Sequence, residues 1–250
     1  MQQLFDPIYF LESKQMQLTL WKRTLCAAGL ALVIASPAQA LITVATFEDI
    51  TPNFFLPPEA IAQGAYTFTV TAGLGVVDTS AAFGAGSGLD LAGPTGNASK
   101  FFIGLNDASM RLRATDSSAF WLRGLDFGFV SALTQLFAPG QNPGQLVASY
   151  ETQGGSFGTL SWSFGNASAG GTFSFRSLGL ADMAPLSGGL RQIDFSACTY
   201  DLALACVNPN SNFSQFAMDN ISVSNVPEPG SLLLMALGLG LVGNRIRRRA

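Results

Sequence analysis

Histidine is absent from this 250-residue chain, and charged residues make up only 12% of it. Without histidine the chain lacks the commonest general base and the commonest transition-metal ligand, so Ser-His-Asp and Cys-His catalytic centres are excluded. The sequence also has neither a P-loop nor a Rossmann glycine fingerprint. These absences predict a protein that is not an enzyme.

Basic residues are scarce in the segment from Leu41 to Val226. This segment has thirteen acidic residues and only six basic ones, which are Lys100, Arg111, Arg113, Arg123, Arg176 and Arg191. Binding to nucleic acid needs a clustered basic face that neutralises phosphates. The acidic balance therefore excludes nucleic acid as a partner.

Cysteine is nearly as rare, with three residues in the chain. Cys26 falls in an N-terminal segment that we expect to be removed, which leaves Cys198 and Cys206. An even pair in an exported protein predicts a disulfide, here one that closes the short loop CTYDLALAC. Two free buried thiols are the alternative.

The N-terminus has the parts of a secretory signal peptide. A positive pair, an apolar run and a small-x-small cleavage site follow one another within residues 22–40, with Ala38 and Ala40 as the two small residues. Cleavage at this site would remove residues 1–40. Met16 lies a normal distance before the apolar run, so we expect it to be the true initiator, and an unusually long leading region is the alternative.

Short segments of alternating hydrophobicity dominate residues 41–225. Tyr66, Phe68 and Val70 alternate with threonines within residues 65–72, as a half-buried strand requires. The other predicted strands are 41–47, 100–105, 120–130, 145–151, 159–164, 172–178, 191–197 and 215–224, and residues 81–96 are expected to form a loop. Turns rich in glycine, proline and asparagine separate them, which predicts a single all-β domain, an antiparallel β-sandwich of the jelly-roll-like kind.

The chain ends in three consecutive parts. Pro227, Glu228 and Pro229 come first, an apolar run occupies residues 231–243, and the last part contains Arg245, Arg247, Arg248 and Arg249. A helix over the apolar run would rise only about 20 Å, short of the roughly 30 Å hydrocarbon core of a bilayer. This length predicts a transient anchor, and the arginines would keep their end in the cytoplasm.

This tail resembles the PEP-CTERM sorting signal of Gram-negative bacteria. The resemblance assigns residues 226–250 to that signal and implies export through the Sec machinery, transient insertion into the inner membrane and processing by exosortase, a membrane-embedded enzyme. The processed protein would lie at the cell surface or in the extracellular matrix, in association with exopolysaccharide in a biofilm. The alternative is an ordinary tail anchor with an incidental Pro-Glu-Pro.

The resemblance extends inward to two shorter elements. Gln215, Phe216 and Asp219 match the QFxxD element of one subgroup of these proteins, and residues 46–50 resemble the acidic first strand of many of them.

The first and last predicted strands both carry acidic residues at one end. Such strands often lie side by side in Greek-key arrangements, so Glu48, Asp49, Asp219 and Asn220 could supply the hard oxygen ligands of a calcium ion, the one cofactor that the sequence suggests. The alternative is that Asp219 and Asn220 cap the end of a strand.

Three aromatic residues could stack on sugar rings, namely Trp121, Tyr150 and Trp162, although each also fits a place in the core or on the sheet.

The sequence as a whole is compatible with three functions. The first is a non-catalytic surface or matrix protein, and the second is a carbohydrate- or calcium-binding module. The third, a glycan-cleaving enzyme, would need two carboxylates facing each other across a cleft.

Overall fold

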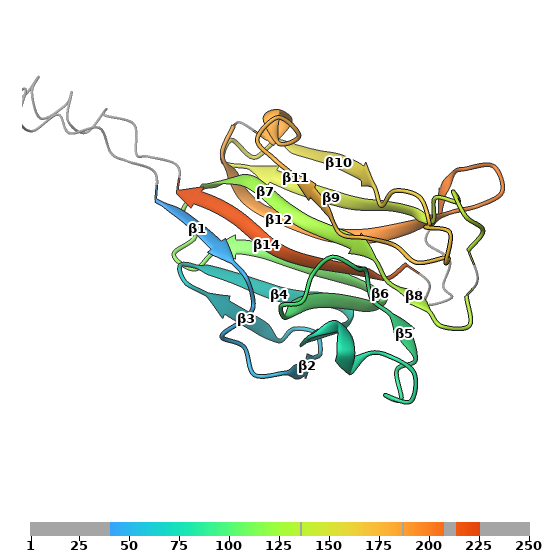
Figure 1. Ribbon diagram of the computed structural model, residues 1–250. Helices are drawn as coiled ribbons and strands as arrows, with labels where there is room; N and C mark the ends of the chain where they lie inside the picture. The colour runs from blue at the N-terminus through green and yellow to red at the C-terminus, as the bar shows by residue number, and fades with distance from the viewer. Residues whose placement is uncertain (1–40, 136, 187, 208–213, 226–250) are drawn as a thin grey trace, which may run out of the picture. The chain divides into compact units, whose positions relative to one another are not determined.

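The computed structural model describes residues 41–135, 137–186, 188–207 and 214–225, and strands dominate this part of the chain (Figure 1). The strands are β1 (Ile42–Ala45), β2 (Asn53–Phe55), β3 (Ala60–Gln63), β4 (Tyr66–Asp78), β5 (Leu91–Ala92), β6 (Phe101–Ala114), β7 (Phe120–Phe129), β8 (Ser131–Ala132), β9 (Gly144–Thr152), β10 (Phe157–Ser163), β11 (Arg176–Leu178), β12 (Leu190–Tyr200), β13 (Cys206–Val207) and β14 (Phe216–Asn225). Two 3₁₀ turns, η1 (Ser80–Ala82) and η2 (Ala184–Leu186), lie between them. These strands pair antiparallel, which confirms the predicted all-β class.

Strand β6 connects the two layers of the sandwich because it changes partners along its length. Its first half pairs with β14, and its second half pairs with β12. Since β4 accompanies β6 through both halves, one layer has the order β10-β9-β12-β6-β4-β3. We call this the β12 sheet. The other layer, the β14 sheet, has the order β11-β7-β14-β6-β4-β2, with β1 beside the second half of β14.

The crossing between the two sheets occurs at a sharp irregularity in the β4–β6 pair. Gly73 has a φ of +66°, while Asn106 and Asp107 on the opposite strand have φ values of 57° and 56°. A Cβ atom on Gly73 would lie 2.5 Å from the carbonyl oxygen of Leu105 and 2.6 Å from Cα of Ala108. Glycine is therefore required here both for its backbone angle and for the close approach of the two strands.

The main hydrophobic core contains the inward-facing side chains of both sheets. Phe68 and Phe195 of the β12 sheet and Phe127 and Met218 of the β14 sheet are each fully buried within it. Alternate positions along each strand supply these residues, as the pleat of a half-buried strand requires.

A second, smaller core lies on the other face of the β14 sheet. Segment 79–100 covers this face, and its Phe83 and Leu91 pack with Phe101 and Ala217 of the sheet. The segment that we predicted to be a plain loop thus buries apolar side chains, and it also contributes β5, which pairs with β8.

The first and last strands are neighbours, as predicted. Ala45 lies opposite Ile221 and Ile42 opposite Ser224, so β1 (blue) runs beside β14 (red) in Figure 1. A disulfide joins Cys198 on β12 to Cys206 on β13, with 5.6 Å between their Cα atoms, a normal separation for such a bond.

Several predicted elements lie outside the described residues. These are the signal peptide with Ala38 and Ala40, the Pro227–Pro229 motif and the arginine-rich end. Among the residues that the structure describes, none belongs to a helix with the length and apolar character needed to span a bilayer.

Candidate functional site

The three aromatic residues considered for sugar stacking lie in different surroundings. Trp162 on β10 and Tyr150 on β9 are half-buried and pack against the main core. Trp121, near the start of β7, is also half-buried, but it belongs to neither hydrophobic cluster and instead lines a surface pocket. Of the three rings, Trp121 is therefore the one that packs against neither hydrophobic cluster.

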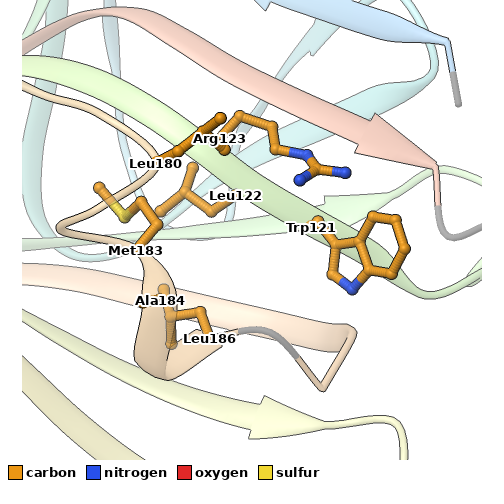
Figure 2. Close-up of a pocket in the computed structure, with 7 residues that line it drawn as sticks. All are labelled: Trp121, Leu122, Arg123, Leu180, Met183, Ala184 and Leu186. Atoms are coloured by element: carbon orange, nitrogen blue, oxygen red, sulfur yellow. The ribbon is translucent and has the colours of Figure 1, made fainter.

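The pocket forms between β7 and the turn that follows β11. Figure 2 shows Trp121 and Arg123 on one side and Met183 with Leu186 from the turn on the other. Its volume is about 220 Å³. This volume is below the roughly 300–1,000 Å³ of typical small-molecule sites, so the pocket suits one ring-sized group rather than a long ligand.

A glycine brings the turn close to β7. A Cβ atom on Gly124 would lie 2.5 Å from the carbonyl oxygen of Leu178, which ends β11. The bare backbone of Gly124 thus lets β11 pair closely with β7. The turn itself is fixed by Asp182, whose carboxylate accepts a hydrogen bond of 2.9 Å from the amide of Gly179.

An arginine is stacked against the tryptophan. Trp121 and Arg123 are two residues apart on one strand and therefore share a face of the sheet. The guanidinium carbon of Arg123 lies 4.6 Å from the centroid of the Trp121 ring, a cation–π contact. Nε of Arg123 also donates a hydrogen bond of 2.7 Å to the hydroxyl of buried Ser224, which lies opposite Trp121 on β14. These two contacts hold the guanidinium group at the rim of the pocket.

The indole nitrogen of Trp121 is buried and has no hydrogen-bond partner among the described residues. A buried donor without a partner costs free energy, so an acceptor supplied by a ligand would be favourable at this point. Among the described residues that line the pocket, Arg123 is the only ionisable one. The described lining thus combines an aromatic ring, apolar side chains and one positive charge.

A second depression lies on the β12 sheet beside the β9–β10 hairpin. Its volume is about 420 Å³, and its lining includes Tyr150, Gln192 and Asp194. Asp194 is held by Arg111 in an ion pair of 2.7 Å. Among the described lining residues Asp194 is the one carboxylate, whereas glycoside hydrolysis uses two that face each other.

The structure does not bring together the three carboxylates of the predicted calcium-binding set, Glu48, Asp49 and Asp219. Within the described ranges, no three Asp, Glu, His or Cys side chains lie close enough together to hold a metal ion. Phe47, with a φ of 57°, turns the chain away after β1. Glu48 then accepts a hydrogen bond of 3.0 Å from the Lys100 amide, while Asp49 is exposed.

The other two predicted ligands lie on β14. Asp219 is 1% exposed, and its Oδ2 accepts hydrogen bonds from Nδ2 of Asn97 at 2.6 Å and from the hydroxyl of Ser99 at 2.9 Å. Asn220 donates a hydrogen bond of 2.7 Å to Oδ2 of Asp126 on β7. Burial raises the pKa of Asp219 above its ordinary value. The hydrogen bonds from Asn97, from the Asn220 amide and from Ser99 act in the opposite direction, and the charge of Asp126 adds to the rise.

Of the QFxxD element, Phe216 and Asp219 are fully buried, and Gln215 is nearly so. Phe216 packs in the main core beside Phe102. These three residues therefore belong to the interior of the domain, although they lie near the end of its sequence.

Comparison with known proteins identifies the sorting tail and the fold class. Residues 225–250 match the PEP-CTERM protein-sorting motif. Among solved structures, the chain is similar to a DUF4465 family protein from Bacteroides caccae ATCC 43185. The two sequences are 12% identical, the superposition covers 74% of this chain and 100% of that chain, and the TM-score is 0.51. At this identity the likeness shows the fold alone.

A second solved structure is TmCBM61 in complex with β-1,4-galactotriose. Its identity is 8%, with 65% of this chain and 90% of that chain covered, and its TM-score of 0.30 carries no argument about fold or ligand. No curated protein matched the chain.

Proposed function

We propose that this protein is a non-catalytic surface or matrix protein that exosortase processes at its C-terminal signal. The observation that carries the proposal is the PEP-CTERM motif over residues 225–250. Export through the Sec machinery, membership of the QFxxD subgroup and association with exopolysaccharide in a biofilm belong to the same proposal.

Two carboxylates of the described domain are committed to ion pairs, which supports a structural role for them. Asp194 pairs with Arg111, and Glu151 pairs with Arg191 at 3.0 Å. The chain has no histidine to serve as a general base. A stable sandwich that presents binding surfaces, rather than a reacting centre, fits these features.

The test is the intact mass of the protein recovered from cells and from medium, in the native host and in a strain without exosortase. We expect a form that begins at Leu41 and ends near Pro227–Pro229, and we expect the strain without exosortase to lack it. A full-length C-terminus in both strains would show that the tail is an ordinary anchor and would overturn the proposal.

A second candidate function is carbohydrate binding at the Trp121 pocket. It is favoured by a half-buried indole outside the core, a stacked guanidinium and a buried indole N–H in need of an acceptor. Sugar rings offer C–H faces to an aromatic ring and hydroxyl oxygens to a donor, and a carboxylated sugar would also pair with Arg123.

Titration of tryptophan fluorescence with neutral and uronic-acid oligosaccharides tests this function. Trp121→Ala and Arg123→Met should each weaken the binding of the acidic oligosaccharide by at least about tenfold. Arg176→Met is the matched control, because Arg176 lies on the adjacent strand β11 and approaches Phe127 at 6.0 Å without lining the pocket. Equal losses in both arginine variants, or no binding by the wild type, would exclude the pocket as a sugar site.

A further inference from the structure

The buried carboxylate of Asp219 is only partly satisfied by hydrogen bonds. Its Oδ2 accepts the hydrogen bonds from Asn97 and Ser99, while its Oδ1 is buried and accepts no hydrogen bond of normal geometry from a described residue, although the adjacent Asn220 amide also interacts with the carboxylate. Asp219 as a whole is 1% exposed. Because solvent is excluded, a carboxylate in such surroundings is stabilised either by taking up a proton or by a positive group at its remaining lone pairs.

A second carboxylate faces the first. Asp126 on β7 lies directly opposite Asp219 on β14, so their side chains share one face of the sheet. Asp126 is half-buried. Like charges placed directly opposite each other on neighbouring strands repel, and the repulsion is stronger where one of them is out of water. The pair therefore concentrates negative charge at one point.

No basic side chain neutralises this pair within the described part of the chain, where the only ion pairs are Arg111–Asp194 and Arg191–Glu151. Lys100 is close in sequence to Asn97 and Ser99, but its ammonium group donates to the carbonyl oxygens of Glu48 and Ile50, both at 2.8 Å. Among the described residues, therefore, no basic side chain offsets the charge of this pair.

The backbone around the pair is shaped to add a third oxygen-bearing side chain. The register of β14 against β7 shifts between Asp219 and Ser222, and Asn220 in this bulge has a φ of 48°. A bulge re-aims the side chain of the bulged residue. Here Nδ2 of Asn220 lies 2.7 Å from Oδ2 of Asp126, and a rotation of the amide group would present its oxygen to the pair instead.

We infer that Asp219 and Asp126 bind a divalent calcium ion, with the Asn220 amide oxygen and water completing its oxygen ligands. Calcium accepts six to eight oxygen ligands in flexible geometry, which suits side chains from two strands and a bulge. Zinc is disfavoured because histidine is absent and the described cysteines form a disulfide. The inference keeps Asp219 and Asn220 of the predicted set and replaces Glu48 and Asp49 by Asp126.

Such an ion would join two strands of the β14 sheet to the segment that covers one face of this sheet. Asp219 belongs to β14, Asp126 belongs to β7, and the partners of Asp219, Asn97 and Ser99, belong to the segment that covers the second core. Calcium should therefore stabilise the covering of that core and not only the two strands.

The test is calorimetric titration of the purified full-length protein with calcium chloride after chelation with EDTA, together with its melting temperature. At calcium concentrations about a hundredfold above Kd, we expect the melting temperature of the wild type to rise by about 5–10 °C over the value in EDTA. Asp126→Asn should abolish both the heat of binding and this rise. Asp49→Asn is the matched control, since it removes an exposed carboxylate of the original set, and it should behave as the wild type does.

The result that would overturn the inference is a wild-type protein with no calcium heat and an unchanged melting temperature. Retention of both effects in Asp126→Asn, or their loss in Asp49→Asn, would also overturn the assignment to this pair. If Asp126→Asn fails to fold, Asn220→Ala provides the second variant, because Asn220 is exposed, and it should weaken calcium binding by about tenfold or more.

Magnesium chloride in place of calcium should give a smaller rise in melting temperature, because magnesium demands octahedral geometry and releases water reluctantly. A rise at least as large with magnesium would exclude calcium as the ion for this site.

Discussion

The crossing of β4 and β6 between the two sheets depends on Gly73, and Gly73→Ala should measure how much. Alanine at a φ of +66° incurs about 1 kcal/mol of backbone strain. Its methyl group would also meet the carbonyl oxygen of Leu105 at 2.5 Å and Cα of Ala108 at 2.6 Å, both backbone atoms that cannot rotate away. Overpacking of this kind costs about 1–3 kcal/mol. The sum is about 3 kcal/mol, which predicts a fall in melting temperature of about 6–12 °C for a domain of this size.

Gly86→Ala is the control that separates the two contributions. Gly86 has a φ of +82°, but a Cβ atom there would have no neighbour within 4 Å. It therefore carries the backbone strain alone, and its melting temperature should fall by only about 2–4 °C. Thermal unfolding followed by circular dichroism measures both variants. Equal falls in the two variants would refute the idea that the close approach of β4 and β6 at Gly73 stabilises the crossing.

Three further predictions concern the interior. Burial, with a smaller contribution from the nearby carboxylate of Asp116, raises the pKa of Tyr66, whose hydroxyl donates a hydrogen bond of 2.8 Å to Asn225. The stability that this group contributes is therefore present below pH 10 and is lost as the pH rises through the folded pKa. A spectrophotometric titration should show a late tyrosine ionisation that Tyr66→Phe removes. Replacing both Cys198 and Cys206 by alanine should lower the free energy of unfolding by about 2.5 kcal/mol, as expected for so short a loop, and an unchanged urea midpoint would contradict this. Phe129→Ala should cost about 3–5 kcal/mol, because its ring packs against three other phenylalanines, and a loss below 1 kcal/mol would show that the cavity collapses.

The sequence was sufficient to predict strands wherever one face of the strand is apolar and the other polar. Tyr66, Phe68 and Val70 are all buried, as their alternation predicted. The same pattern continues through the second half of β6, where the buried Met110 and Leu112 alternate with Arg111 and Arg113, and we did not use it. That part of β6 is the one that crosses to β12, so the omission concealed how the sheets are joined.

Other strands gave no such pattern. β2 and β3 contain three and four residues and lie in a stretch with several prolines, which argues against a strand when it is judged locally. Both form because β4 offers an open edge, along which Phe55 lies opposite Gly75 and Ile61 opposite Phe68. Their pairing is a tertiary effect that local sequence does not encode.

The candidate pocket could be predicted only in part. Trp121 was a candidate from its residue type, but its contact with Arg123 and its separation from the core depend on Gly124, which lets β11 and the following turn approach. Nothing in the local sequence indicates that Leu178 will end a strand against that glycine. The residue type alone made Trp121 a candidate, while its place in a pocket outside both hydrophobic clusters became visible only in the fold.

The acidic cluster shows the same limit for a different physical reason. Register places Asp126 opposite Asp219, and a one-residue shift of β7 against β14 would move Asp126 to the other face of the sheet. The sequence indicated that β1 and β14 would be neighbours, so it favoured Glu48 and Asp49 as partners of Asp219. It carried no comparable indication that β7 would lie on the far side of β14. Acidic side chains from adjacent strands meet only when both the order of the strands and their register are known, and here the structure supplies both for β7 and β14.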